Sequence, residues 1–193
     1  RPDPVAAQKA ERRASLIDVT EAAQQWFVAN LHGQEGEQAR DYLRSRGFSR
    51  RIVEEFGFGF APDSKVAIKG ALSSFEEPML VEAGLLITVD DKAPYDRFRD
   101  RLMLPIQDQR GRVIAFGGRI LEKLDGVAKY LNSPDTPLFD KGRTLYNEAH
   151  ARTAAGRENA LLVAEGYMDV IALAQAQPIT PMAGAPNFPN ISA

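Results

Sequence analysis

The hydrophobic pattern of this chain changes period near residue 85, and that change limits the folds open to it. Before it, apolar residues recur at three- and four-residue steps, the spacing of helices with one buried face. After it come short β-branched and apolar runs separated by polar turns, the pattern of strands. We therefore predict an α/β fold. An α+β N-terminal subdomain with an antiparallel hairpin sheet should precede a single strand–helix–strand segment.

The first part of the chain predicts helices whose ends carry recognisable signals. Gly47 should end the second helix and Ser49 should cap the third, while Pro78 and Gly84 should start and end the last. The expected helices cover residues 1–32, 37–46, 49–57 and two short stretches within 64–83.

The second part predicts strands in "LLITV" and a β-hairpin in which "RLMLPI" and "RVIAFGGRIL" flank the polar turn "QDQRG". "AKYLNSPDTPLF" is expected to be an irregular loop, and "KGRTLYNEAHARTA" to lead into a helix. The polar break at 156–159 is the expected boundary between a first domain, 1–158, and a second, incomplete one, 159–193.

The stretch "LLVAEGYMDV", residues 161–170, predicts a strand that ends on Glu165, turns at Gly166 and starts a helix near Met168. Ligands of parallel sheets bind at the carboxyl ends of strands, where Glu165 would lie. With Asp169 in the first helical turn, two acids suit a hard cation such as Mg²⁺. Asp169 is equally explained as a favourable helix-start residue. No charged residue follows from 170 to 193, so the metal site would be half built.

The segment from 97 to 143 is basic, with ten Lys and Arg residues against six acids, in a chain whose net charge is −2. If they lie in one strand, Arg97, Arg99 and Arg101 project to the same face, where phosphate is the natural anion to place between them. A solvated charged face, partly neutralised by Asp96 and Asp100, explains the same pattern.

Further candidates for nucleic-acid contact follow in the same segment. "GGR" puts Arg119 after two glycines that permit a bend or a close backbone approach. In "KYLNSP", Lys129 can bind phosphate and Tyr130 can stack on a base or pack in the core. Ordinary turn chemistry explains Asn132 equally well. Around Gly142, Lys141 and Arg143 suit phosphate contact or simply a loop.

Composition excludes several classes of protein. The 193-residue chain has 44% hydrophobic and 26% charged residues, a composition typical of a globular protein. It has no cysteine, which removes disulfides and cysteine-ligated zinc. No window has the length of a transmembrane span, so no membrane partner is predicted. The chain starts at Arg1 rather than methionine, so we expect a piece of a longer protein.

Three stretches resemble a known family in order and spacing: "YDRFRDRLMLPIQDQRGRVIAFGGRIL", "AKYLNSPDTPLFDKGRTLYN" and "LLVAEGYMDVIALAQ". They are similar to the RNA polymerase core of bacterial DNA primases of the DnaG type. The last stretch resembles the start of a Toprim domain. The resemblance runs from about residue 10 to 182.

The resemblance implies template-directed synthesis of short RNA primers on single-stranded DNA, with Mg²⁺ or Mn²⁺. It places the catalytic glutamate on Glu165, with Gly166 and Asp169 completing the motif. It also implies a set of nucleotide- and template-binding residues: Arg46, Arg97, Arg99, Arg119, Lys129, Tyr130 and Lys141. Asn132 and Arg143 join this set from the residue argument.

The implied partners are single-stranded DNA, RNA–DNA hybrid and ribonucleoside triphosphates. The replicative helicase and single-strand-binding protein are expected to bind regions outside this chain. Zinc is expected to bind an N-terminal domain that is not part of this sequence. The implied location is the bacterial cytoplasm, in association with the nucleoid. Toprim proteins carry a later Asp-x-Asp pair that this chain lacks, so we expect the chain alone to bind nucleic acid without polymerising.

Two alternatives remain open from the sequence. One is a non-catalytic single-stranded DNA-binding module; the other is a different Toprim enzyme, a nuclease or topoisomerase-like protein. A further hypothesis concerns strand 161–164, which would expose a sheet edge without a neighbour and so invite dimerisation.

Overall fold

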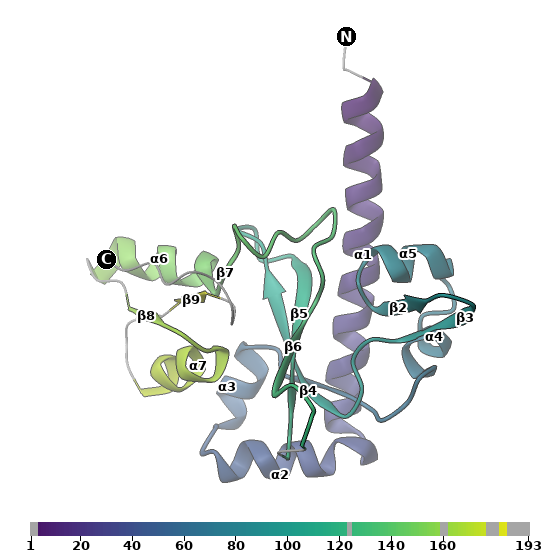
Figure 1. Cartoon of the computed structure of the whole chain (residues 1–193). Coiled ribbons are helices and arrows are strands. Elements are labelled where there is room, and N and C mark those ends of the chain that lie inside the picture. Colours follow the sequence, from purple (N-terminus) through teal and green to yellow (C-terminus); the bar gives the residue numbers. More distant parts are fainter. Residues whose placement is uncertain (1–3, 123–124, 159–161, 177–181, 185–193) are drawn as a thin grey trace.

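Helix α1 (Pro4–His32) forms where the apolar stripe predicted it. Leu16, Val19, Ala23, Phe27 and Leu31 recur every three or four residues and are all buried. Residues 4–12 are exposed, and these turns rise above the rest of the chain (Figure 1). The computed structural model describes residues 4–122, 125–158, 162–176 and 182–184, so the predicted start of the helix at residue 1 lies outside it.

The remaining helices are short, and several end at the predicted signals. Gly47, after the second predicted helix, has a φ of 77°, and the Ser49 side chain accepts a hydrogen bond from the Ile52 backbone N–H. These helices are the 3-10 turn η1 (Gln34–Gly36), α2 (Glu37–Ser45), α3 (Arg50–Glu55), α4 (Ala67–Ala71), α5 (Glu77–Glu82), α6 (Glu148–Glu158) and α7 (Tyr167–Ala176).

The main sheet is antiparallel and has the order β1-β4-β5-β6, with the predicted hairpin at its centre. Its strands are β1 (Gly59–Ala61), β4 (Arg101–Gln107), β5 (Val113–Ile120) and β6 (Tyr130–Asn132). Strand β6 corrects the prediction of an irregular loop, because Tyr130 pairs with Arg119 across the sheet. A separate hairpin joins β2 (Leu86–Val89) to β3 (Lys92–Asp96).

The strand–helix–strand segment is present near the C-terminus. Strand β8 (Val163–Ala164) pairs in parallel with β9 (Met182–Gly184), and α7 lies between them in sequence. The expectation that this strand lacks a neighbour is therefore wrong for 163–164, while dimerisation remains a hypothesis. Strand β7 (Leu145–Tyr146) pairs with β9 from the other side. The predicted polar break is wrong at 156–158, which belong to α6, and the boundary at 158/159 stays a prediction.

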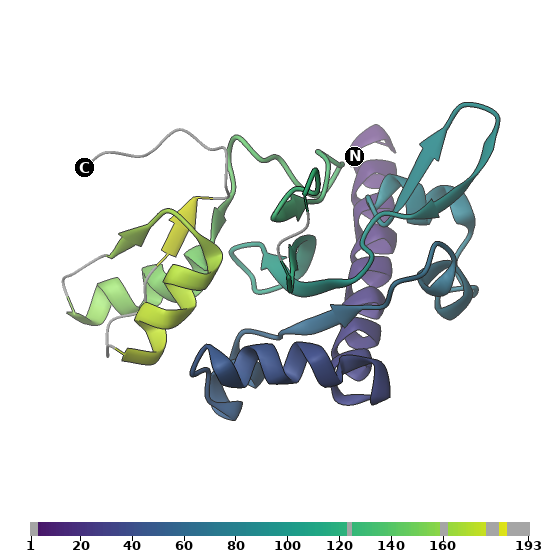
Figure 2. The ribbon, with the colours of Figure 1, turned by 60° about the horizontal axis from the view of Figure 1, so that its bottom comes forward.

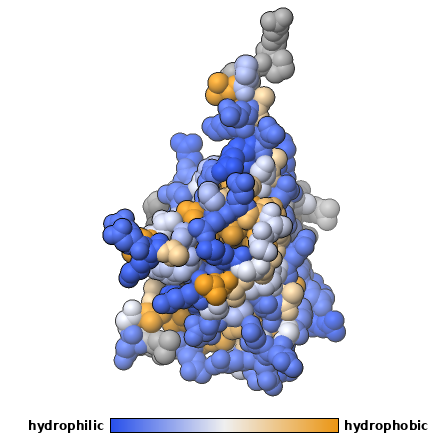
Figure 3. Space-filling view, turned by 90° about the vertical axis from the view of Figure 1, so that its right-hand side faces the viewer, coloured by the Kyte–Doolittle hydropathy of each residue, from blue (hydrophilic) through white to orange (hydrophobic). Residues whose placement is uncertain are grey.

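The three-stranded sheet β7-β9-β8 lies to one side of the main sheet in both ribbon views. In Figures 1 and 2, α6, α7 and the β7-β9-β8 sheet form a group beside β5 and β6, and α1 lies on the other side of that hairpin. The face in Figure 3 is largely hydrophilic, with hydrophobic residues in separate patches. Within the residues described, no helix combines the length and hydropathy needed to cross a membrane.

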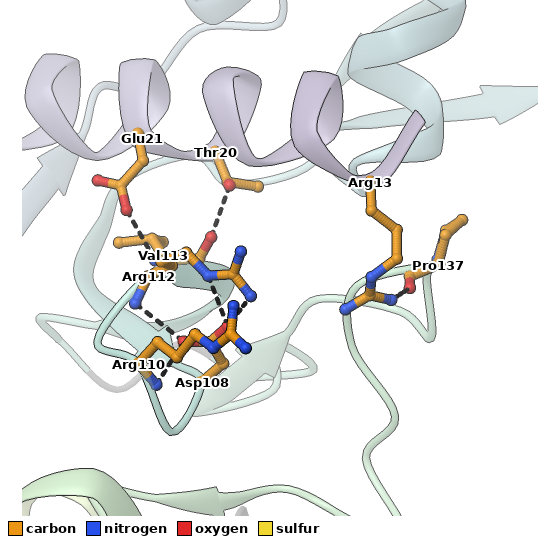
Figure 4. A network of polar contacts seen from close by, with 8 residues as sticks. All are labelled: Arg13, Thr20, Glu21, Asp108, Arg110, Arg112, Val113 and Pro137. Atoms are coloured by element: carbon orange, nitrogen blue, oxygen red, sulfur yellow. Dashed lines mark hydrogen bonds and ion pairs between the residues drawn. The ribbon is translucent and has the colours of Figure 1, made fainter. Parts of the chain in front are cut away.

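Helix α1 fixes the hairpin through side-chain hydrogen bonds to the first residue of β5 (Figure 4). The Thr20 hydroxyl donates to the Val113 carbonyl oxygen at 2.7 Å, and Glu21 Oε1 accepts from the Val113 N–H at 2.8 Å. Since Thr20 and Val113 are buried, water does not replace these partners. The turn below is closed by Asp108, which accepts hydrogen bonds from Arg112.

We expect Thr20→Val to lower the free energy of unfolding by about 1–3 kcal/mol, because it leaves the buried Val113 carbonyl without its donor at nearly constant volume. Urea denaturation measures the change. Thr153→Val on exposed α6 is the matched control and should change stability by less than about 0.5 kcal/mol. Equal effects of the two substitutions would contradict the role given to Thr20.

A buried carboxylate holds the small helix α4. Asp96 ends β3, is 2% exposed, and accepts a hydrogen bond at 2.9 Å from the Ile68 backbone N–H. Burial raises the pKa of Asp96, against the opposing effect of backbone hydrogen bonds. This residue therefore binds the first turn of α4, in addition to its electrostatic interaction with Arg99.

The raised pKa of Asp96 predicts a pH dependence. A carboxyl whose folded pKa lies above its unfolded value of about 3.9 contributes stability that is lost as pH rises through the folded pKa. Asp96→Asn keeps an acceptor without titrating. The free energy of unfolding of Asp96→Asn minus that of wild type should therefore increase from pH 3 to pH 7. Denaturation at each pH measures this difference. A constant or falling difference would contradict the burial effect.

Candidate nucleic-acid interface

The centre of the site is a close approach between β5 and helix α7 at Gly117. A Cβ atom added at Gly117 would lie 2.7 Å from Cε2 of Tyr167, so the tyrosine ring rests on the backbone of the strand. No other residue fits at position 117 without moving that ring. The prediction of a close backbone approach at "GGR" is confirmed, and the partner is the tyrosine of "EGYMDV".

Tyr167 connects the acidic turn to the main sheet. It is fully buried, and its hydroxyl donates a hydrogen bond to Asn132 Oδ1 at 3.1 Å. Its ring packs edge-on against Tyr146 and Tyr130, with centroids 4.7 Å and 6.1 Å apart. Burial raises the pKa of Tyr167, which keeps the hydroxyl protonated and able to donate. The residue after Gly166 is therefore fixed against β5 and β6.

A cation–aromatic cluster lies beside this contact, and we define it as Tyr42, Arg119, Lys129 and Tyr130. Arg119 Cζ lies 4.6 Å from the Tyr42 ring centroid and 6.0 Å from that of Tyr130. Lys129 is exposed, with Nζ 5.7 Å from the Tyr130 ring. Such stacking orders the guanidinium and leaves both cations their charge. Tyr42 was not among the predicted site residues, because it lies on α2, far in sequence from its partner Arg119.

The arginines of "RFRDR" do not share the face of one strand, so that prediction is wrong. Strand β3 ends at Asp96, β4 begins at Arg101, and Asp100 between them has a left-handed backbone with φ of 47°. The alternation of a strand therefore does not apply to Arg97 and Arg99.

Two of these arginines bind backbone carbonyls. Arg97 donates through Nε and Nη2 to the Asn132 carbonyl oxygen at 3.1 and 2.8 Å. Arg101 is buried and donates to the carbonyls of Gly118 and Ala128. Burial lowers the pKa of Arg97 and of Arg101, yet guanidinium stays charged in proteins. Both residues thus hold β6 and its approach in place, while Arg99 stacks 5.3 Å from the Tyr95 ring.

The acidic turn is exposed. Glu165 follows β8, and Asp169 lies in the first turn of α7. Gly166 is not among the glycines with a left-handed backbone. Its small size leaves room instead, because a Cβ there would lie 3.0 Å from Asp169 Oδ2. Both carboxylates thus follow the carboxyl end of β8 in sequence, and their joint role in a site stays a prediction.

These carboxylates fit part of a site for a hard divalent cation, which prefers oxygen ligands. No group of three or more His, Cys, Asp or Glu side chains able to hold a metal occurs among the described residues. The assignment of Glu165 and Asp169 as two ligands of a larger set therefore stays a prediction.

The remaining predicted cations lie on exposed or half-exposed loops. Arg46 is exposed directly after α2, and Arg143 is exposed with Nε 3.8 Å from Asp140 Oδ2. Lys141 is half-exposed, and its backbone N–H donates to Asp135 Oδ1. Their role in binding phosphate stays a prediction.

Comparison with known proteins identifies the family. The model described as "DNA primase catalytic core, N-terminal domain" matches residues 26–152. The chain is 42% identical over 167 residues to the DNA primase of Salmonella typhimurium, covering 85% of this chain and 28% of that protein. It is 46% identical over 165 residues to the DNA primase of Pseudomonas putida, covering 83% and 24%. The chain thus spans about a quarter of the length of the curated relatives it matches.

Solved structures agree with this result. A DnaG primase catalytic domain bound to single-stranded DNA has a TM-score of 0.83 and 41% identity, covering 91% of this chain and 55% of that one. The RNA polymerase domain of Mycobacterium tuberculosis primase DnaG, in complex with double-stranded DNA carrying a six-nucleotide overhang, has a TM-score of 0.84 and 32% identity. That match covers 92% of this chain and 56% of that one.

The fold and the shared sequence define a mixed α/β catalytic-core domain. The chain belongs to the DNA primase catalytic core family, in its N-terminal domain, as the resemblance in the sequence implied.

We expect Tyr167→Phe to cost about 1 kcal/mol of unfolding free energy, because it removes only the hydroxyl bond to Asn132 and keeps the ring on Gly117. Gly117→Ala should cost more, since its Cβ collides with that ring. Thermal or urea unfolding measures both. Gly70→Ala, where a Cβ meets nothing within 4 Å, is the control for Gly117→Ala. A tolerated Gly117→Ala would contradict the close contact.

Proposed function

We propose that this chain is the nucleic-acid-binding N-terminal part of the catalytic core of a DNA primase, which synthesises RNA primers on single-stranded DNA. The observation that carries the proposal is the contact of Tyr167 with Gly117 and Asn132. It brings the Glu165 turn against β5, which holds Arg119, and β6, which directly follows Lys129. Family membership and the DNA bound by the related DnaG structures support the same proposal.

We assign the cluster to template and phosphate binding. Lys129 and Arg46 are exposed cations that suit single phosphate contacts. Arg119, stacked between Tyr42 and Tyr130, offers a guanidinium of fixed orientation. Tyr130 is half-buried, with an aromatic face that suits a stacked base. Arg99, Lys141 and Arg143 remain proposed phosphate ligands.

In this proposal Asn132 and Arg97 support the binding surface without contacting the nucleic acid. The Asn132 side chain accepts from Tyr167, and its carbonyl accepts from Arg97. Both residues therefore position β6, which carries Tyr130, rather than contacting phosphate themselves.

The carboxylates Glu165 and Asp169 would hold Mg²⁺ or Mn²⁺ in the whole protein. A bound divalent cation supplies charge stabilisation for the phosphates of a ribonucleoside triphosphate. The chain's own residues bind and orient the template and the triphosphate beside these carboxylates. The βαβ segment β8-α7-β9 is proposed as the start of a Toprim domain, with the domain boundary near 158/159. Contacts with an RNA–DNA hybrid, helicase and single-strand-binding protein are proposed for the whole protein.

A second candidate applies to the 193-residue chain by itself. Because the described residues supply only two carboxylates to the cation site, we propose that the isolated chain binds single-stranded DNA without extending a primer.

The test is a salt titration of binding to a single-stranded oligonucleotide. Each phosphate contact contributes about 0.7 to the slope of log K against log salt, so Lys129→Ala should weaken binding and reduce the slope by about that amount. Lys92→Ala, on the exposed β2–β3 hairpin, is the matched control and should change neither quantity. If Lys129→Ala and Lys92→Ala behave alike, the cluster is not the binding surface.

A further inference from the structure

Helix α7 is attached to the N-terminal part of the chain at both ends, and only the first attachment belongs to the acidic motif. At its start, Tyr167 is bound to Asn132 and seated on Gly117. At its last turn, the Gln175 amide makes two hydrogen bonds with the turn between α2 and α3. Gln175 Nε2 donates to the Gly47 carbonyl oxygen, and its Oε1 accepts from the Ser49 backbone N–H, both at 2.8 Å.

The turn that Gln175 binds is itself rigid. The Phe48 N–H donates to the Leu43 carbonyl, and the buried Phe48 ring packs 5.9 Å from that of Phe58. The Ser49 hydroxyl caps α3. Both ribbon views place α7 next to α3 (Figures 1 and 2). A side chain of α7 that binds this turn therefore holds the helix against a fixed part of the N-terminal subdomain.

The same turn carries Arg46, directly before Gly47. Helix α7 thus has the carboxylates Glu165 and Asp169 beside its first turn and a proposed phosphate-binding arginine beside its last. The ten residues of α7 span about 15 Å. The helix sets the distance between the acidic turn and Arg46 only if both of its ends stay attached.

We propose that Gln175 is a positioning residue that fixes the acidic turn relative to Arg46 and the cation–aromatic cluster. This inference rests on the proposed function for its consequence in primer synthesis, but its geometric content does not. An amide is needed at this position because only it both donates to Gly47 and accepts from Ser49. A carboxylate would keep the second bond and lose the first.

The lack of native cysteine allows a direct distance measurement. Nitroxide labels at Asp41→Cys on α2 and Ala172→Cys on α7, both exposed, report the distance between these helices by pulsed electron resonance. We expect a single narrow distribution in the wild-type background, a broader one with Gln175→Ala, and an intermediate one with Gln175→Glu. Gln25→Ala, at an exposed position on α1, is the matched control and should leave the distribution narrow.

Primer synthesis by the whole protein gives the second measurement. Gln175→Ala should lower kcat by about tenfold to a hundredfold, the scale of small misplacements of reacting groups, and change the Kd for template less than twofold. A purely structural role would lower the unfolding midpoint and leave both the distribution of the folded chain and kcat unchanged.

Three outcomes are decisive. An unchanged distance distribution in Gln175→Ala overturns the proposal, and so does a broadened distribution with unchanged kcat. If the wild-type whole protein makes no primers, the proposed function fails and the catalytic consequence fails with it. The distance measurement alone then confirms or overturns the fixing of α7 by Gln175.

Discussion

The seat of the Tyr167 ring on the backbone of Gly117 is the contact on which the arrangement of the site depends. It needs a residue without a side chain in β5 and an aromatic residue directly after the acidic turn. Helix α1 fixes β5 through Thr20 and Glu21. Because Tyr167 packs on the same strand, the position of the Glu165 turn depends on the helical core as well. Packing of the long helix, the central hairpin and the acidic turn therefore forms one continuous series of contacts.

Arginine has two different roles in this structure, although the sequence pattern around each is similar. Arg97 and Arg101 are directed inward and donate hydrogen bonds to carbonyl groups of β6 and of the residues just before it. Arg119 stacks on two tyrosines, and Lys129 and Arg46 remain exposed. The inward arginines hold β6 and the residues just before it, which include Lys129, so part of the positive charge in segment 97–143 supports the fold.

The helices, the hairpin and the strand–turn–helix at Glu165 could be predicted because each has a local signal of period, cap or glycine. The arginine arrangement could not be predicted from alternation, because the left-handed backbone at Asp100 breaks the strand. The contacts of Tyr42 with Arg119 and of Gln175 with Gly47 join residues 77 and 128 positions apart, and no local pattern indicates them. Strand β6 was missed since its pairing with β5, rather than its own composition, makes it a strand.

The most direct test of this account is the distance between the acidic turn and a bound template. Because the chain has no cysteine, Glu165→Cys introduces a single one. An iron chelate tethered to this cysteine cleaves nearby nucleic acid, and the labelled chain is mixed with a saturating single-stranded oligonucleotide. The account predicts cleavage at a limited set of nucleotides, well above that produced by the same chelate at residue 92. Equal cleavage from the two positions would show that the cationic surface does not lead to the acidic turn.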